Sequence, residues 1–277
     1  MQYRMLAMDL DGTLTNSRKE VSDRNKEYVQ KAAEAGVHIV IASGRPEIAQ
    51  RKIVERLELR RTGGYMLACN GSHIKEFRKD GEKSLRSITL HPDTIARAAA
   101  FARESGVDAF SYNNTGILTE NPEGEWLQKE VYNCALPLVY TDCLEETLNK
   151  AKIQTHKMVF TASHEDLLLI KEDLEKLLGD DAWVFFSEPH FLEITPPGID
   201  KATSLKWLCA YLDIRPEEVV ACGDSGNDIS MLRFAGRGVA VGNALPEVKE
   251  AADCTVASND EDGVAEAVGK YILNEAQ

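Results

Sequence analysis

Short apolar runs alternate with helical patterns over the first third of the chain. The runs Met5–Met8, Val37–Ala42 and Tyr65–Cys69 predict three buried strands. Segments with helical spacing lie between them, at 22–35 and 46–59. Because strands and helices alternate, this part of the sequence predicts a parallel sheet.

The pattern changes in the middle of the chain. The runs 74–77 and 85–90 flank a polar turn at Lys79–Glu82 and predict a β-hairpin. Beyond the hairpin the spacing predicts strands and helices in no regular alternation: strands at 107–112, 157–161, 183–186 and 191–194, and helices at 92–104 and 164–178.

The parallel rhythm resumes after Pro196, with a helix at 201–212 followed by three more strands, at 219–222, 238–241 and 254–257. The expected fold class is therefore α/β: a Rossmann-like core with a parallel sheet and an inserted α+β cap domain. The expected boundaries place residues 1–82 and 193–277 in the core and residues 83–192 in the cap.

Composition narrows the class of partner. The chain has 277 residues, of which 43% are hydrophobic, enough for one large or two moderate domains. Its formal net charge of −13 argues against nucleic acid or an anionic membrane as a partner. No apolar run is as long as a membrane span, and the first strand starts without a preceding signal peptide. The six cysteines include no Cys-x-x-Cys pair, so reduced thiols and a cytoplasmic location are expected.

Two carboxylates follow the first strand, in the segment Asp9–Leu14. Ligands of open α/β sheets bind beyond the carboxyl ends of the strands, so a site is expected here. Two close carboxylates raise each other's pKa, and a bound divalent cation such as Mg²⁺ removes that cost. The alternative is a strand that simply ends in an Asp-Gly turn.

Three further segments carry polar groups suited to the same site. Ser43 precedes Gly44, whose backbone N–H is open to an anion near a helix N-terminus. Lys201 starts a helix, and Gly223–Asp228 brings two more carboxylates among glycines. Four acids that converge with a lysine and a serine suit a metal ion and phosphoryl transfer. Each residue also has a structural alternative, since a serine or an aspartate there can cap a helix.

The chain resembles the haloacid dehalogenase superfamily, within the Cof-type sugar-phosphatase group that carries a large α/β cap. Four motifs occur in the family's order: Asp9–Leu14, Ser43–Pro46, Lys201 after a glycine turn, and Gly223–Asp228. They cover roughly residues 1–80 and 195–277, whereas the cap matches in layout more than in sequence.

The resemblance implies a role for each motif. Asp9 would attack phosphorus and form an aspartyl-phosphate, and Asp11 would act first as general acid and then as general base. Ser43, Gly44 and Lys201 would hold the phosphate, and Asn227 would contact it or orient the lysine.

The resemblance also implies a metal site. Mg²⁺ would lie between Asp9, the backbone carbonyl of Asp11 and Asp224, with Asp228 in support. One departure concerns this region: the family commonly has Ser-Lys-Gly around the lysine, and this chain has Asp200-Lys201-Ala202. The added charge puts in doubt how strongly Lys201 attracts phosphate.

The expected function is that of a Mg²⁺-dependent phosphatase of small phosphorylated metabolites, above all sugar phosphates. A phosphomutase and a phospho-accepting signalling module are the alternatives, and either a monomer or a homodimer is compatible with the sequence. Four residues are candidate substrate contacts as well as candidate structural residues: Arg45, Asn70, His190 and Glu193.

Overall fold

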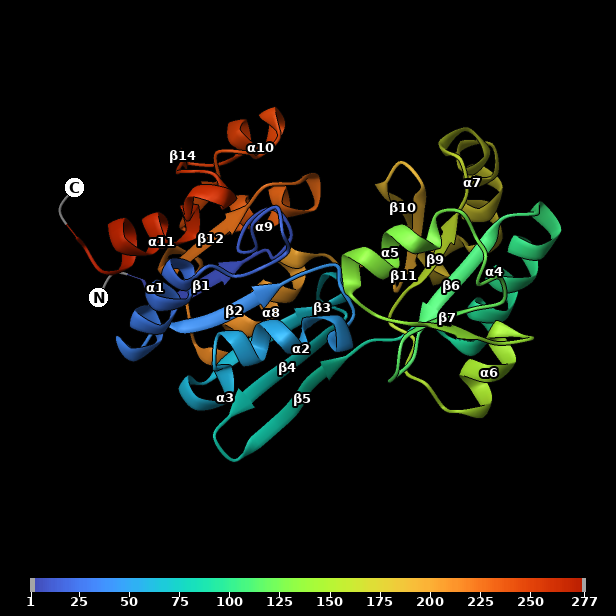
Figure 1. Cartoon of the computed structure of the whole chain (residues 1–277), viewed down its shortest axis with the longest axis horizontal. Coiled ribbons are helices and arrows are strands. Elements are labelled where there is room, and N and C mark those ends of the chain that lie inside the picture. Colours follow the sequence, from blue (N-terminus) through green and yellow to red (C-terminus); the bar gives the residue numbers. More distant parts are fainter. Residues whose placement is uncertain (1–2, 276–277) are drawn as a thin grey trace. The chain divides into compact units, whose positions relative to one another are not determined.

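The computed structural model describes residues 3–275, which form two compact units. The core unit consists of Met1–Arg86 and Asp200–Gln277, and the second unit consists of Ser87–Ile199. The second unit is thus a continuous insertion in the chain of the first (Figure 1).

An eight-stranded sheet forms the centre of the core unit, in the order β14-β13-β12-β1-β2-β3-β4-β5. Neighbours from β14 to β3 pair in parallel, and β4 pairs antiparallel with β3. The strand β1 lies between β2 and β12 and is buried at every residue. The strands are β1 (Met5–Met8), β2 (His38–Ala42), β3 (Gly64–Ala68), β4 (His73–Arg78), β5 (Gly81–Ser87), β12 (Val219–Gly223), β13 (Arg237–Ala240) and β14 (Cys254–Thr255).

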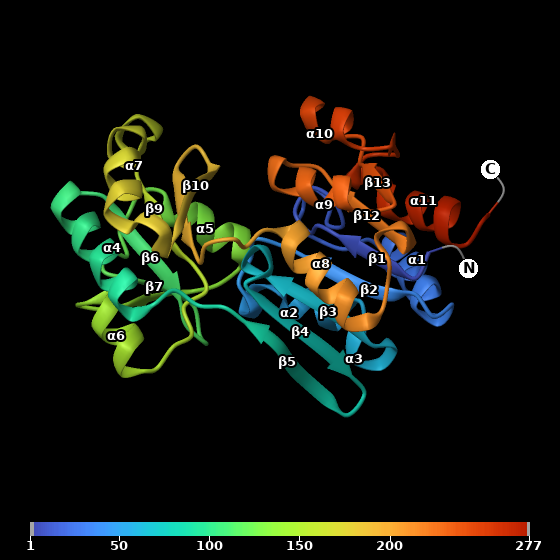
Figure 2. The ribbon, with the colours of Figure 1, turned by 180° about the vertical axis from the view of Figure 1, so that it is seen from behind.

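Helices cover both faces of this sheet. Helix α2 lies in front of it in Figure 1, and α8 lies in front of it when the molecule is seen from behind in Figure 2. The longer helices begin at side-chain caps: Ser22 accepts a bond from Asn25 N–H before α1, and Asp200 accepts one from Thr203 N–H before α8. The helices are α1 (Asp23–Glu34), α2 (Glu47–Arg56), α3 (Leu59–Thr62), α8 (Lys201–Leu212), α9 (Ile229–Phe234), α10 (Pro246–Ala251) and α11 (Gly263–Ala267).

The second unit has its own sheet and its own core. Six strands lie in the order β10-β11-β9-β6-β7-β8, and Met158 and Phe160 of β9 pack with residues of α4 and α7. The strands are β6 (Asp108–Tyr112), β7 (Ile117–Thr119), β8 (Leu138–Tyr140), β9 (Met158–Thr161), β10 (Trp183–Glu188) and β11 (Phe191–Thr195), and the helices are α4 (Pro92–Ser105), α5 (Leu127–Cys134), α6 (Leu144–Lys150) and α7 (His164–Leu178).

The α/β fold class with a Rossmann-like core and an inserted α+β unit is confirmed. The unit boundaries differ from those expected, because β5 continues to Ser87 and keeps residues 83–86 with the core. Residues 193–199 belong to the second unit, since β11 pairs with β9 and β10. Within residues 3–275, none of the helices combines the length and the apolar composition that crossing a bilayer demands.

Candidate active site

Asp9 lies at the end of the central strand of the core sheet. Its backbone N–H donates to the carbonyl of Cys222 at 3.0 Å, which continues the parallel pairing of β1 with β12. Its side chain is buried, with 5% of the residue exposed. The sheet therefore fixes this carboxylate against the end of the neighbouring strand.

Lys201 bridges two carboxylates in the interior. Its Nζ lies 2.5 Å from Asp9 Oδ1 and 2.7 Å from Asp228 Oδ1, and both Lys201 and Asp228 are fully buried. The doubt raised by Asp200 is removed by its geometry: the Asp200 carboxylate accepts a hydrogen bond from Thr203 N–H at 2.6 Å and caps α8. This cap fixes the start of the helix that carries Lys201.

The fourth motif folds into a loop that presents Asp224 and holds Asp228 in place. Asp228 Oδ2 accepts hydrogen bonds from the backbone N–H groups of Asp224 and Ser225, each at 3.0 Å. Thr13, which the sequence did not single out, donates its hydroxyl to Asp224 Oδ1 at 2.7 Å. Gly12 has a φ of +80°, and a Cβ there would lie 2.6 Å from Asp224 Oδ2. Only glycine lets the first loop approach Asp224 this closely.

Three carboxylates share one lysine at this point. Oxygen atoms of Asp9, Asp224 and Asp228 lie within 4.8 Å of one another, so the cluster carries two negative charges in excess of Lys201. Burial, reinforced by Asp228 and Asp224, raises the pKa of Asp9 well above its ordinary value despite the attraction of Lys201. Burial likewise raises the pKa of Asp224 to about 6.

This donor set fits a hard divalent cation. Carboxylate oxygens are the ligands that such ions take, and two positive charges balance the excess on the cluster. Both oxygens of Asp228 already have partners, Lys201 on one side and two backbone N–H groups on the other. Asp9 and Asp224 are therefore better placed than Asp228 to ligate an ion directly.

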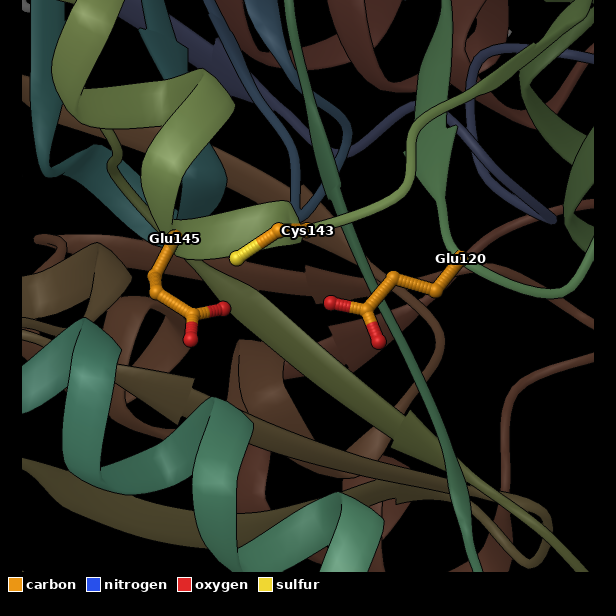
Figure 3. Close-up of side chains that lie close together, drawn as sticks. All are labelled: Glu120, Cys143 and Glu145. Atoms are coloured by element: carbon orange, nitrogen blue, oxygen red, sulfur yellow. The ribbon is translucent and has the colours of Figure 1, made fainter.

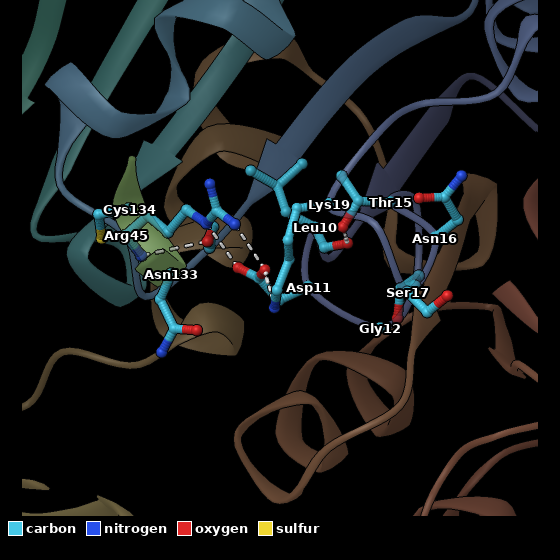
Figure 4. A network of polar contacts seen from close by, with 12 residues as sticks. Leu10, Asp11, Gly12, Thr15, Asn16, Ser17, Lys19, Arg45, Asn133 and Cys134 are labelled. Carbon is cyan, nitrogen blue, oxygen red and sulfur yellow. Dashed lines mark hydrogen bonds and ion pairs between the residues drawn. The ribbon is translucent and has the colours of Figure 1, made fainter. Parts of the chain in front are cut away.

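The side chain of Asp11 takes no part in that cluster. Its two oxygens accept bonds from Arg45 Nε and Nη2, each at 2.6 Å, and Oδ1 also lies 2.8 Å from Lys19 Nζ (Figure 4). Burial tends to raise the pKa of Asp11, but the bonds from Arg45 and Lys19 outweigh it and hold that pKa below its ordinary value. The predicted general acid therefore lies here as a carboxylate paired with two cations.

Ser43 and Gly44 lie at the end of β2, where a phosphate-holding loop is expected. Ser43 is buried, and its hydroxyl accepts a hydrogen bond from Arg45 N–H at 3.1 Å. A Cβ on Gly44 would lie 3.4 Å from Asn70 Oδ1. The absence of a side chain at residue 44 thus leaves space for the Asn70 amide.

Asn70 belongs to an unusual turn at the end of β3. Three successive residues, Cys69, Asn70 and Gly71, have φ values of 48°, 56° and 98°. The turn is tied to the second motif, because Asn70 N–H donates to Ser43 O at 2.9 Å, and to α8, because the Ser204 hydroxyl donates to Gly71 O at 3.0 Å. Left-handed residues that are not glycine are strained, and such strain clusters at functional sites.

Replacing Gly71 by alanine is expected to destabilise the fold by about 3 kcal/mol, because the left-handed strain adds to overpacking. The new Cβ would lie 2.3 Å from Ser204 Cβ. Gly36→Ala is the matched control, since Gly36 has a φ of +88° and nothing lies within 4 Å of an added Cβ. Urea denaturation measures both, and an equal loss of unfolding free energy would contradict the steric explanation.

The remaining candidate residues divide between the two units. Asn227 is exposed and donates to Asn70 Oδ1 at 3.3 Å, which joins the fourth motif to the turn after β3. In the second unit, His190 stacks on Trp126 with ring centroids 3.5 Å apart. Glu193 lies buried 2.9 Å from Lys157 Nζ. Within their own unit, His190 and Glu193 thus have structural partners.

A second group of potential metal ligands lies in the second unit. Glu120, Cys143 and Glu145 lie close together in Figure 3. Arg103 pairs with both glutamates, at 2.8 and 2.5 Å, and Glu120 also accepts a bond from Leu144 N–H at the start of α6. These contacts account for the group as an ion-pair network that supports a helix start.

Comparisons with known proteins agree with the motifs. A family model described as haloacid dehalogenase-like hydrolase matches residues 6–268. The chain is 32% identical over 274 residues to the 5-amino-6-(5-phospho-D-ribitylamino)uracil phosphatase YcsE of Bacillus subtilis, which covers 99% of this chain and 97% of the relative.

Solved structures show the same similarity. A haloacid dehalogenase-like hydrolase from Bacteroides thetaiotaomicron superposes with a TM-score of 0.90 at 36% identity, covering 97% of this chain and 99% of that one. A subclass IIB sugar phosphatase of the same superfamily gives a TM-score of 0.80 at 26% identity, covering 97% and 98% of the two chains. The predicted enzyme class, phosphoric monoester hydrolase, is confirmed, and the chain belongs to the haloacid dehalogenase-like hydrolase family.

Proposed function

We propose that this enzyme hydrolyses small phosphorylated metabolites through a covalent aspartyl-phosphate on Asp9. The observation that carries the proposal is the buried cluster in which Lys201 bridges Asp9 and Asp228 beside Asp224. A carboxylate held against a lysine at the end of the central strand suits attack on an electron-poor phosphorus.

The two chemical steps assign one task to each acid of the first motif. An oxygen of Asp9 bonds to phosphorus while the bond from phosphorus to the ester oxygen breaks, and Asp11 gives its proton to the departing alkoxide. Asp11, now a carboxylate, takes a proton from water as the water oxygen bonds to phosphorus. The bond between phosphorus and Asp9 then breaks and releases phosphate.

Phosphate binding falls to the surrounding loops. We assign this role to the Ser43 hydroxyl, Gly44 N–H, Lys201 and Asn227, which lie on three loops joined by the turn at Asn70. Lys201 in addition balances the charge of Asp9, since its Nζ lies 2.5 Å from that carboxylate.

We further propose that the divalent cation is Mg²⁺. Asp9, Asp224 and the backbone carbonyl of Asp11 would hold it, and Asp228 would support the site by aligning Lys201 and the Asp224 backbone. The ion would supply charge that stabilises the transferring phosphoryl group.

Sugar phosphates are the proposed main substrate class, supported by the likeness to a sugar phosphatase. The named relative acts on a different phosphorylated metabolite, which keeps the class broader than sugars. The second unit is proposed as the specificity cap, with Arg45, Asn70, His190 and Glu193 as candidate substrate contacts. A cytoplasmic location is proposed from the free cysteines at positions 69, 134, 143, 209, 222 and 254.

A panel of phosphorylated metabolites tests the proposal. With Mg²⁺ present, released phosphate is expected for several members, and EDTA should stop the release until Mg²⁺ is added back. Release of phosphate without isomer formation distinguishes a phosphatase from a phosphomutase. A stable phosphoprotein without turnover would instead support a signalling module and contradict hydrolysis.

Asp11→Asn is expected to separate the two steps. An activated aryl phosphate has a leaving group that needs no proton, so Asp9 should still be phosphorylated in a burst of about one equivalent. Turnover after the burst should slow by about 10²–10⁴-fold, because no base activates water. Rapid-quench kinetics measure both phases, and an equal fall in burst and steady-state rates would reject Asp11 as the base.

A further inference from the structure

The cations around Asp11 indicate a property of the substrate beyond its phosphate. Arg45 and Lys19 together make three short contacts to the two oxygens of one carboxylate (Figure 4). Asp11 neutralises one of the two positive charges, so the group as a whole is cationic. In a chain with a net charge of −13, a local positive charge of this kind attracts anions.

The position of Lys19 is built into the backbone. Lys19 has a φ of 61°, a left-handed conformation that costs a residue other than glycine about 1 kcal/mol or more. The Asn16 side chain holds the surrounding turn, since Asn16 Oδ1 accepts bonds from the N–H groups of Arg18 and Glu20 at 3.0 and 3.1 Å. This turn places an ammonium group 2.8 Å from Asp11 Oδ1.

This arrangement conflicts with proton transfer by Asp11. A general acid or base must lie within hydrogen-bond reach of the reacting oxygen, at about 2.6–3.2 Å. Both oxygens of Asp11 are already bonded to Arg45, and one also to Lys19. Asp11 must therefore give up part of this pairing before it can act.

Releasing Asp11 leaves the two cations without their anion. The Arg45 side chain is only 10% exposed, so water replaces the lost partner poorly. Removing one member of a largely buried ion pair is costly, because the charge that remains is uncompensated. A second anion that arrived with the substrate would remove this cost.

We propose that the enzyme favours phosphomonoesters whose leaving alcohol carries a second anionic group, a carboxylate or another phosphate. This group pairs with Arg45 and Lys19 in place of Asp11 and frees Asp11 for proton transfer. The inference rests on the proposed function and adds a substrate class to it. Neutral sugar phosphates are then poorer substrates than phosphorylated acids or bisphosphates of similar size.

Matched substrate pairs test the inference. Phosphoglycolate is compared with its neutral amide, and propane-1,3-diol bisphosphate with the monophosphate, so that the carboxylate and the phosphate are assessed separately. The parent enzyme is expected to favour the member with the second anion by about tenfold or more in kcat/KM, which corresponds to about 1.4 kcal/mol. A preference below about twofold in both pairs would overturn the proposal.

A lysine variant with a matched control locates the effect. Lys19→Gln should reduce the preference to about threefold or less, and it should leave kcat on the neutral members unchanged or higher because Asp11 is released more easily. Lys26→Gln is the control, because Lys26 pairs with Glu58 at 2.7 Å and does not contact Asp11. An equal effect of the two substitutions would assign the preference to overall charge and reject the site.

The outcomes also separate this inference from the proposed function. If the parent enzyme hydrolyses charged and neutral esters equally well, the phosphatase proposal stands and only the second-anion preference is rejected. If it releases phosphate from none of the four esters or from an aryl phosphate, the proposed function itself fails.

Discussion

Asp9→Asn is expected to abolish phosphate release while leaving the fold intact. Loss of a nucleophile that forms a covalent intermediate lowers kcat by about 10⁴-fold or more, and an amide cannot form the acyl phosphate. Activity towards an aryl phosphate with Mg²⁺ measures the loss. Retained turnover would remove Asp9 as nucleophile.

The same substitution is expected to preserve or raise stability in metal-free protein. The pKa of Asp9 is raised in the folded state, chiefly by burial and by its like-charged neighbours, so its ionised form is disfavoured there. Above the ordinary pKa of aspartate the unfolded chain carries this charge freely, and the folded protein therefore loses stability as pH rises. Asparagine removes this contribution. Melting temperatures at pH 5 and pH 8 should thus differ less for the variant than for the parent.

Lys201→Met is expected to affect both activity and stability strongly. Removing the only cation from the buried cluster leaves Asp9, Asp224 and Asp228 uncompensated, and such a loss costs about 3–5 kcal/mol. Hydrolysis should fall to the detection limit, since both phosphate binding and the alignment of Asp9 depend on the lysine. Urea denaturation and phosphate release measure the two effects.

Two further variants separate charge from catalysis. Adding Asp228→Asn to Lys201→Met removes one of the unpaired charges, so stability should partly recover while activity does not. Lys75→Met is the matched control, because Lys75 also bridges two carboxylates, those of Glu47 and Glu82, at 2.7 and 2.6 Å. It should lose stability and retain kcat. A comparable loss of kcat in both lysine variants would point to general destabilisation.

Long periodic elements were predictable from the sequence. The helices at 164–178 and 201–212 have the predicted bounds, because their apolar spacing persists over several turns and each begins next to a side-chain cap. Strands of three residues, such as β7 and β8, carry too short a pattern to be recognised. The strand β11 was predicted, but its membership of the second sheet depends on pairing with β9, which local periodicity does not encode.

The candidate site was predicted to a similar extent. Motif order brought Asp9, Lys201, Asp224 and Asp228 together correctly, because the carboxyl ends of parallel strands meet at one edge of a sheet. Lys19 was missed, since its role depends on a left-handed backbone that no residue preference announces in a lysine. The pairing of Asp11 with Arg45 was missed for the same kind of reason: it joins residues 34 positions apart in sequence.

The discontinuity of the core unit has a consequence for the order in which the protein acquires structure. The second unit is one uninterrupted stretch of chain, Ser87–Ile199, and can close its own sheet as soon as that stretch is synthesised. The central strand β1 must wait for β12, and Asp9 must wait for a lysine 192 residues further along the chain. Contacts of such separation are slow to form, because loop closure precedes any gain from them. On the nascent chain, the inserted unit is thus expected to become resistant to proteases first, and enzymatic activity to arise last.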